Sequence, residues 1–453
     1  MSEFNVPEYK LSEDFIFGTA TSSYQIEGAW DQDGKGESIW DRFSHQKGNI
    51  LNEDTGDVAC DHYNRFKEDI ALMKKLNLDS YRFSISWPRV LPKGYGEVNQ
   101  AGLDFYKELV DELLAADIEP AITLYHWDLP QALQEEGGWE NRDTVNYFVE
   151  YAELLFKELG DKVDKWITHN EPWVTSFLGN YFGEHAPGKN DLSAAIQVAH
   201  NLLVSHGKTV KKFREMNLSG EIGITLDLHA IYPVSQTEAD IKAADLEDAF
   251  SNRWFLDPVF KGGYPENLLN KFKDNFNKPV IEAEDMELIS QEIDFLGINY
   301  YTRHVIEADK SANADEIFDY KHVKMIGNPH TEMGWEVYPD GLYDILVHLK
   351  EKYTDKPLYI TENGRASDDK IDEYGRVNDK DRIDYYASHL KAVERAIKSG
   401  VSVAGYYAWS LMDNFEWAWG YTRRFGLIYV DFETKERILK DSARWYSQVI
   451  RNN

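Results

Sequence analysis

The sequence predicts a (β/α)8 barrel that forms a single domain, residues 1–453, with long loops after its strands. Three observations favour this fold class. Eight short strand-like runs occur along the chain, helical patterns lie between several of them, and polar and aromatic residues gather where the runs end. Alternating strands and helices imply parallel strands with helical crossovers, and eight such units close a barrel whose active site lies at the carboxyl ends of the strands.

The strand-like runs are short and rich in β-branched and aromatic residues, which is typical of buried parallel strands. In chain order they are residues 15–25, 80–87, 119–127, 165–171, 221–228, 294–301, 357–364 and 405–414.

Three segments carry apolar residues every three or four positions, the spacing of one face of a helix. They are residues 66–76, 103–114 and 145–159. The first precedes the second strand-like run and the second follows it, as crossover helices would. A doubly wound open sheet is the alternative fold, but no glycine-rich phosphate turn follows the first run.

The chain is longer than the barrel needs. A barrel of this kind takes about 250 residues, whereas the chain has 453. We therefore expect the excess in four long loops, residues 31–60, 179–189, 229–292 and 302–337.

Composition and charge exclude several classes of protein. A formal net charge of −30 argues against nucleic acid and anionic membranes as partners. No apolar run approaches the ~18 residues of a membrane span, and the first residues lack the apolar stretch of a signal peptide. The one cysteine, Cys60, excludes an internal disulfide framework, so a soluble cytoplasmic protein is expected. Adaptation to high salt is a further hypothesis for the acidic charge.

Two carboxylates end two different strand-like runs. Glu362 closes the run 357–364 and Glu171 closes the run 165–171, each beside an asparagine. A charge at the end of a buried strand is costly unless it has a partner or a task. Two carboxylates that face one pocket are the minimum for glycoside hydrolysis, at ~5–5.5 Å in the retaining reaction. The alternative is two unrelated loop carboxylates.

Other residues at the strand ends suit a sugar, which has hydroxyl rims around apolar C–H faces. Donors and acceptors for hydroxyl groups are Gln25, His126, Asn170 and Glu416, and flat apolar faces are Trp127, Trp409 and Trp417. Structural roles in the core are the alternative for the histidine and the tryptophans. No histidines or carboxylates have the spacing of a metal site, so neither a metal nor another cofactor is expected.

Several of these residues lie in segments that resemble glycoside hydrolase family 1, the retaining β-glucosidase family, over nearly the whole chain. The segments, in the order expected for the family, are FGTATSSYQIEG (17–28), YRFSISWPR (81–89), LYHWDLP (124–130), THNEP (168–172), GINYY (297–301), ITENG (360–364) and WSLMDNFEW (409–417). The resemblance is carried by several independent motifs in one order, which chance does not produce.

The resemblance implies a role for each matched residue. Glu171 would be the acid/base and Glu362 the nucleophile, with Arg82 and Tyr301 holding the nucleophile. The substrate-binding residues would be Gln25, His126, Trp127, Asn170, Asn299, Tyr301, Trp335, Trp409, Glu416, Trp417 and Phe425. Trp409 would be the stacking floor under the sugar, and Trp335 a platform for the aglycone.

The resemblance also implies a substrate class: terminal β-D-glucosyl residues, with galactosyl and fucosyl as further candidates, of cello-oligosaccharides and aryl or alkyl O-glucosides. Relatives that act on 6-phosphosugars lack the pair Glu416-Trp417 and have a tyrosine where this chain has Phe425. A 6-phospho-β-glucosidase, a transglycosylase and a non-catalytic sugar-binding protein stay open as alternatives. A homo-oligomer also stays open.

Overall fold

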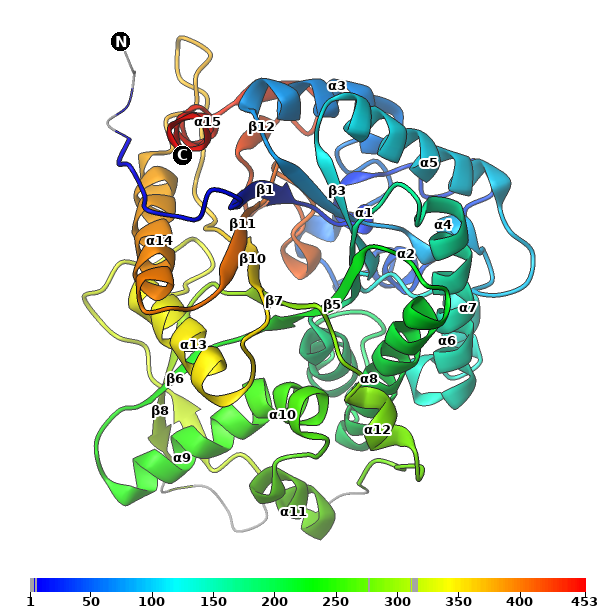
Figure 1. Ribbon diagram of the computed structural model, residues 1–453, viewed down its shortest axis with the longest axis vertical. Helices are drawn as coiled ribbons and strands as arrows, with labels where there is room; N and C mark the ends of the chain where they lie inside the picture. Colours follow the sequence, from blue (N-terminus) through cyan, green and yellow to red (C-terminus); the bar gives the residue numbers. More distant parts are fainter. Residues whose placement is uncertain (1–3, 5, 276–277, 310, 312–316) are drawn as a thin grey trace.

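The computed structural model describes residues 4, 6–275, 278–309, 311 and 317–453. Eight parallel strands close a barrel in the order β1-β11-β10-β7-β5-β4-β3-β2. They are β1 (Ile16–Ala20), β2 (Ser80–Ser84), β3 (Glu119–Tyr125), β4 (Lys165–Asn170), β5 (Glu221–Asp227), β7 (Phe295–Asn299), β10 (Leu358–Asn363) and β11 (Val403–Trp409). Figure 1 shows these strands in the middle of the molecule and the helices around them. The expected (β/α)8, or TIM, barrel is confirmed, and each expected run contains or overlaps one of its strands.

The first and last runs differ most from the expectation at their ends, and the run 80–87 is also too long, because β2 stops at Ser84 and α4 begins at Trp87. β1 stops at Ala20, and Ser23–Ile26 form helix α1, where the Ser22 hydroxyl donates to the Gln25 side chain at 2.7 Å. β11 begins at Val403 and stops at Trp409. After it, Asn414 donates to the Ser410 hydroxyl, a local side-chain bond that replaces strand pairing.

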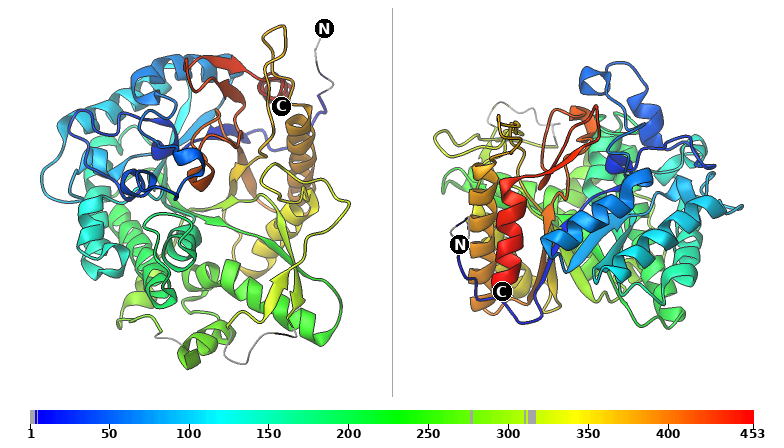
Figure 2. Two further views of the ribbon diagram at one scale, coloured as in Figure 1. Left: turned by 180° about the vertical axis from the view of Figure 1, so that it is seen from behind. Right: turned by 90° about the horizontal axis from the view of Figure 1, so that it is seen from above.

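The three expected helical segments are α3 (His62–Leu76), α5 (Gln100–Ala115) and α7 (Arg142–Leu159). The side chain of Asn141 accepts from the Asp143 amide and caps α7. The other helical segments of the described ranges are α1 (Ser23–Ile26), α2 (Ile39–Ser44), η1 (Leu51–Glu53), α4 (Trp87–Val90), α6 (Gln131–Glu135), η2 (Gly138–Glu140), η3 (Val174–Phe182), α8 (Leu192–Glu215), α9 (Glu238–Asp248), η4 (Ala249–Arg253), α10 (Trp254–Lys261), α11 (Glu266–Asn275), α12 (Asp285–Ile289), α13 (Pro339–Lys352), α14 (Lys380–Lys398), η5 (Trp417–Trp419) and α15 (Asp441–Asn452). The right-hand view of Figure 2 shows α14 and α15 side by side on the outside of the barrel.

Two of the four expected loops contain strands of their own. The loop 229–292 holds β6 (Ala230–Pro233) and helices α9 to α12, and the loop 302–337 holds β8 (Arg303–Ala308) and β9 (Tyr320–His322). These strands form a separate sheet in the order β6-β8-β9, and β12 (Ile428–Val430) pairs with β13 (Arg437–Leu439). Positions 276–277, 310 and 312–316 of the expected loops lie outside the described residues.

The main core fills the space between the barrel and its helices. Phe156 of α7 meets Trp166 of β4 edge to face, with 5.0 Å between ring centroids. Across the ranges that the structure describes, no helix has an apolar stretch sufficient to traverse a bilayer.

Candidate active site

A cavity of about 630 Å³ lies at the carboxyl ends of the barrel strands. Its size is that of a small-molecule site. Most of the site residues expected from the sequence line it: His126, Trp127, Glu171, Tyr301, Trp335, Glu362, Trp409, Glu416, Trp417 and Phe425.

The other four expected residues, Gln25, Arg82, Asn170 and Asn299, are fully buried and do not line this cavity. The Gln25 amide donates to Asn414 at 3.0 Å and to the Phe415 carbonyl at 2.8 Å. In this arrangement Gln25 supports the segment that carries Glu416 and Trp417.

A continuous chain of hydrogen bonds joins the two strand-end carboxylates. Arg82 donates to Glu362 at 2.7 Å and to Asn170 at 2.6 Å. Asn299 donates to the same Asn170 oxygen at 3.0 Å and to Glu171 at 2.6 Å. The residues come from β2, β4, β7 and β10, so closure of the barrel assembles the network. Bonds to ionised groups in a buried setting are strong, and the network holds both carboxylates in defined positions.

Burial raises the pKa of Glu171 well above its ordinary value, and the carboxylates of Asp227 and Glu362 raise it further. Burial raises the pKa of Glu362 as well, but two neighbours oppose the change. These are the positive Arg82 and the Tyr301 hydroxyl, which donates to Glu362 at 2.7 Å. Glu171 therefore keeps its proton to higher pH than Glu362 does.

Glu416 adds a carboxyl group to the cavity wall. Burial and the nearby Glu362 raise the pKa of Glu416 to about 8, while Arg423 lowers it. Its buried Oε2 atom has no partner among the described residues. A buried polar atom without a partner is costly, so this oxygen is suited to a ligand hydroxyl.

Aromatic rings form two groups in the cavity wall. The centroids of the Trp127 and Trp417 rings lie 4.5 Å apart, and both rings pack against the His126 ring. In the second group the Tyr301 ring lies 5.2 Å from that of Trp335 and 6.1 Å from that of Phe425. Both groups offer apolar surface beside hydrogen-bonding groups.

Sequence reasoning missed some residues of the cavity. Asp227 ends β5 and lines the cavity, and its place at a strand end was a signal that could have included it. Three histidines, His229, His304 and His322, also line the cavity. Nothing in the local sequence marks these histidines, because they come from the long insertions after β5 and β7.

Comparisons with known proteins agree with this geometry. The family model described as Glycosyl hydrolase family 1 matches residues 8–453. "Beta-glucosidase A" of Acetivibrio thermocellus is 52% identical over 453 residues, 100% of both chains, and "Beta-glucosidase A" of Thermotoga maritima is 50% identical over 445 residues, 98% of both. The solved "Family 1 b-glucosidase from Thermotoga maritima" is 49% identical, with a TM-score of 0.94 and 99% of each chain covered. The chain therefore belongs to glycosyl hydrolase family 1, as its sequence motifs led us to expect.

Proposed function

We propose that this glycoside hydrolase is a retaining β-glucosidase in which Glu171 is the acid/base and Glu362 the nucleophile. One observation carries the proposal. Two buried carboxylates at the carboxyl ends of β4 and β10 line the same cavity, and their surroundings raise the pKa of Glu171 well above its ordinary value, whereas Arg82 and Tyr301 oppose the rise at Glu362. Retaining glycosidases need this division of roles between two carboxyl groups.

The reaction then runs in two displacements. The Glu362 oxygen attacks the anomeric carbon while protonated Glu171 gives its proton to the leaving oxygen. Glu171 next removes a proton from a water molecule, which attacks the same carbon and releases the sugar with its configuration retained. Arg82 and Tyr301 hold the two oxygens of Glu362 and so fix its direction of attack.

The cavity wall favours an unphosphorylated glucosyl group. Glu416 presents an unpartnered carboxyl oxygen, which suits a sugar hydroxyl. His126 and Trp417 stand beside it, and Trp409 offers a flat face for the ring. Arg423 is a positive group that could attract the phosphate of a phosphosugar. Its charge, however, lowers the pKa of Glu416, and its guanidinium lies 4.4 Å from the centroid of the Trp419 ring.

The second aromatic group, with Trp335, suits the aglycone or the next sugar of a cello-oligosaccharide. Short products of cellulose degradation are therefore the natural substrates we propose. Galactosyl and fucosyl groups are further candidates at the same site. A cytoplasmic location is part of the proposal and is supported by Cys60, a buried free thiol that is the one cysteine of the sequence.

The decisive experiment measures p-nitrophenol release from p-nitrophenyl β-glucoside by the wild type and by Glu362→Ala, with and without azide. We expect activity in the wild type, its loss in the variant, and rescue by azide with α-glucosyl azide as the product. Glu171→Ala is the matched variant: it should lose about 10²- to 10⁴-fold in rate and give the β-azide when rescued. An α-azide from Glu171→Ala would reverse the two roles.

The same assay separates the alternatives. Release from 6-phospho-β-glucoside without release from the unphosphorylated substrate would replace our proposal with a phosphoglycosidase. Glucosyl transfer to an added sugar in preference to water would identify a transglycosylase.

A further inference from the structure

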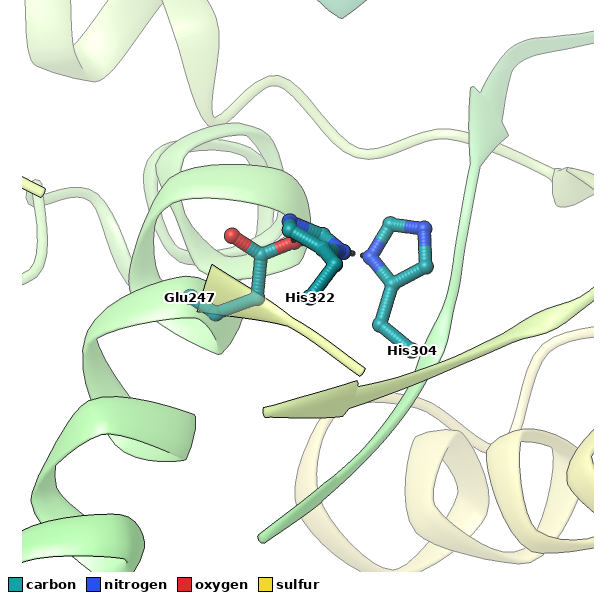
Figure 3. A group of neighbouring side chains, drawn as sticks. All are labelled: Glu247, His304 and His322. Atoms are coloured by element: carbon teal, nitrogen blue, oxygen red, sulfur yellow. Dashed lines mark hydrogen bonds and ion pairs between the residues drawn. The ribbon is translucent and has the colours of Figure 1, made fainter. Parts of the chain in front are cut away.

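Three potential metal ligands meet beside the cavity, and two of them, His304 and His322, line it. Glu247 lies on α9, His304 on β8 and His322 on β9. One ligand atom from each lies within 4.8 Å of the others. Figure 3 shows the three side chains converging from the helix and the two strands.

The register of the small sheet explains why the two histidines meet. β8 and β9 are antiparallel, with Ile306 opposite His322. Residues 304 and 306 of one strand face the same side, so His304 and His322 are diagonal neighbours on one face. Their ring centroids lie 4.6 Å apart, and α9 places Glu247 against them.

The distances suit a small metal ion. The Glu247 Oε1 atom lies 2.8 Å from His304 Nδ1 and 3.7 Å from His322 Nε2. Tetrahedral zinc, with bonds of about 2.0–2.2 Å, requires ligand atoms about 3.3 Å apart. The observed distances lie on either side of that value, so small side-chain shifts would complete the geometry.

Neighbouring groups hold two of the three ligands in place. The Ser251 hydroxyl donates to Glu247 Oε1 at 2.8 Å, and the Tyr320 hydroxyl donates to Oε2. The His229 ring stacks on His304 with centroids 4.0 Å apart. The Glu247 side chain is 2% exposed whereas that of His322 is 53% exposed, so the site has a fixed floor and an accessible side.

We propose that Glu247, His304 and His322 bind a divalent transition-metal ion of the zinc type. Two imidazoles and one carboxylate suit zinc better than magnesium or calcium, which prefer all-oxygen sites. His304 and His322 line the same cavity as Glu171, so a fourth ligand position faces the path of the substrate. Bound zinc therefore inhibits hydrolysis from the wall of the cavity and takes no part in the chemistry.

The test is calorimetric titration of the whole, chelator-treated and dialysed protein with zinc chloride at pH 7.5. We expect one site in the wild type and binding at least about tenfold weaker in His322→Asn, which changes an exposed side chain. His330→Asn is the matched control, because His330 lines the same cavity outside the cluster. Glu247→Gln changes the buried ligand and should weaken zinc binding in the same way.

No zinc binding by the wild type, or equal affinity in His322→Asn, would overturn the proposal. Glu362→Ala, which we expect to be inactive, should bind zinc as tightly as the wild type, so the titration does not depend on the catalytic roles. Inhibition of the wild type by zinc should disappear in His322→Asn. Inhibition that persists there would place the inhibitory ion elsewhere.

Discussion

Three residues of the cavity wall have left-handed backbone conformations that only glycine adopts without strain. They are Trp127 with a φ of 80°, Glu171 with 46° and Trp417 with 46°. Such conformations cost of order 1–3 kcal/mol each and persist where the surroundings impose them. At Glu171 the amide donates to the Thr225 carbonyl at 3.0 Å, and Asn299 holds the carboxyl group. Backbone strain at these residues indicates that the surrounding structure holds the side chains of the cavity wall in fixed positions.

Asp227 should set part of the pH dependence of activity at pH values where it is ionised, since burial raises its own pKa well above the ordinary value. It raises the pKa of Glu171, and activity is lost on the basic side when Glu171 gives up its proton. We therefore expect Asp227→Asn to move the basic limb of the kcat/KM profile to lower pH. Glu184→Gln, at another cavity-lining carboxylate, is the control and should leave that limb in place. An unmoved limb in Asp227→Asn would show that Asp227 is uncharged when Glu171 titrates.

At the scale of elements, strand pairing is irregular close to Glu171 and Glu362. The register of β10 shifts between Ile360 and Glu362 against β7, and that of β4 shifts between Ile167 and Asn170 against β5. Bulges of this kind turn a side chain to a new direction and are common beside active sites. The π-helical segment η3 begins at Val174, shortly after β4 ends at Asn170, and such turns also occur often at functional sites.

A buried charge network anchors the segment that follows β11. Lys440 is fully buried and donates to Asp369 and Asp413, each at 2.6 Å. Asp413 belongs to the segment 409–417, which carries Glu416 and Trp417. The network therefore connects the cavity wall to the residues just before α15.

Removing the cation of this network should destabilise the protein. Lys440→Met leaves Asp369 and Asp413 short of a buried partner, and we expect a loss of about 3–5 kcal/mol in the free energy of unfolding. Lys380→Met is the control, because Lys380 pairs with Asp384 on the surface and should change stability by less than about 1 kcal/mol. Urea unfolding of both variants measures the difference, and equal midpoints would contradict the role of the network.

At the scale of the whole molecule, the acidic surface is the dominant electrostatic feature. A net charge of −30 favours solubility but makes the folded chain repel itself. Salt screens this repulsion over about 10 Å at 0.1 M ionic strength, and it screens surface ion pairs as well.

We expect the repulsion to outweigh the ion pairs. Raising potassium chloride from about 0.05 M to about 0.5 M, which shortens the Debye length about threefold, should therefore raise the thermal unfolding midpoint. Calorimetry at a series of salt concentrations measures this. A midpoint that is highest at low ionic strength would contradict both the prediction and the hypothesis of salt adaptation.

Much of the fold and site could be predicted from sequence because the signals are local. The helical spacing of residues 145–159 and the alternation of strands with helices are properties of short segments. Glu171 and Glu362 were identifiable since each ends a buried strand, and parallel strands bring such ends to one face. The ends of the first and last strands were predicted wrongly, because local side-chain bonds compete there with sheet pairing.

The sequence by itself determined the barrel, the strand-end carboxylates and the family. Only the tertiary structure decided that Gln25 lies behind the cavity wall, that Asp227 acts on Glu171, and that β8 and β9 bring His304 and His322 to Glu247. The physical reason is the range of the interactions. Hydrophobic periodicity acts within a segment, whereas strand pairing and buried charge join residues far apart in the chain, and their partners exist only once the barrel and its insertions have folded.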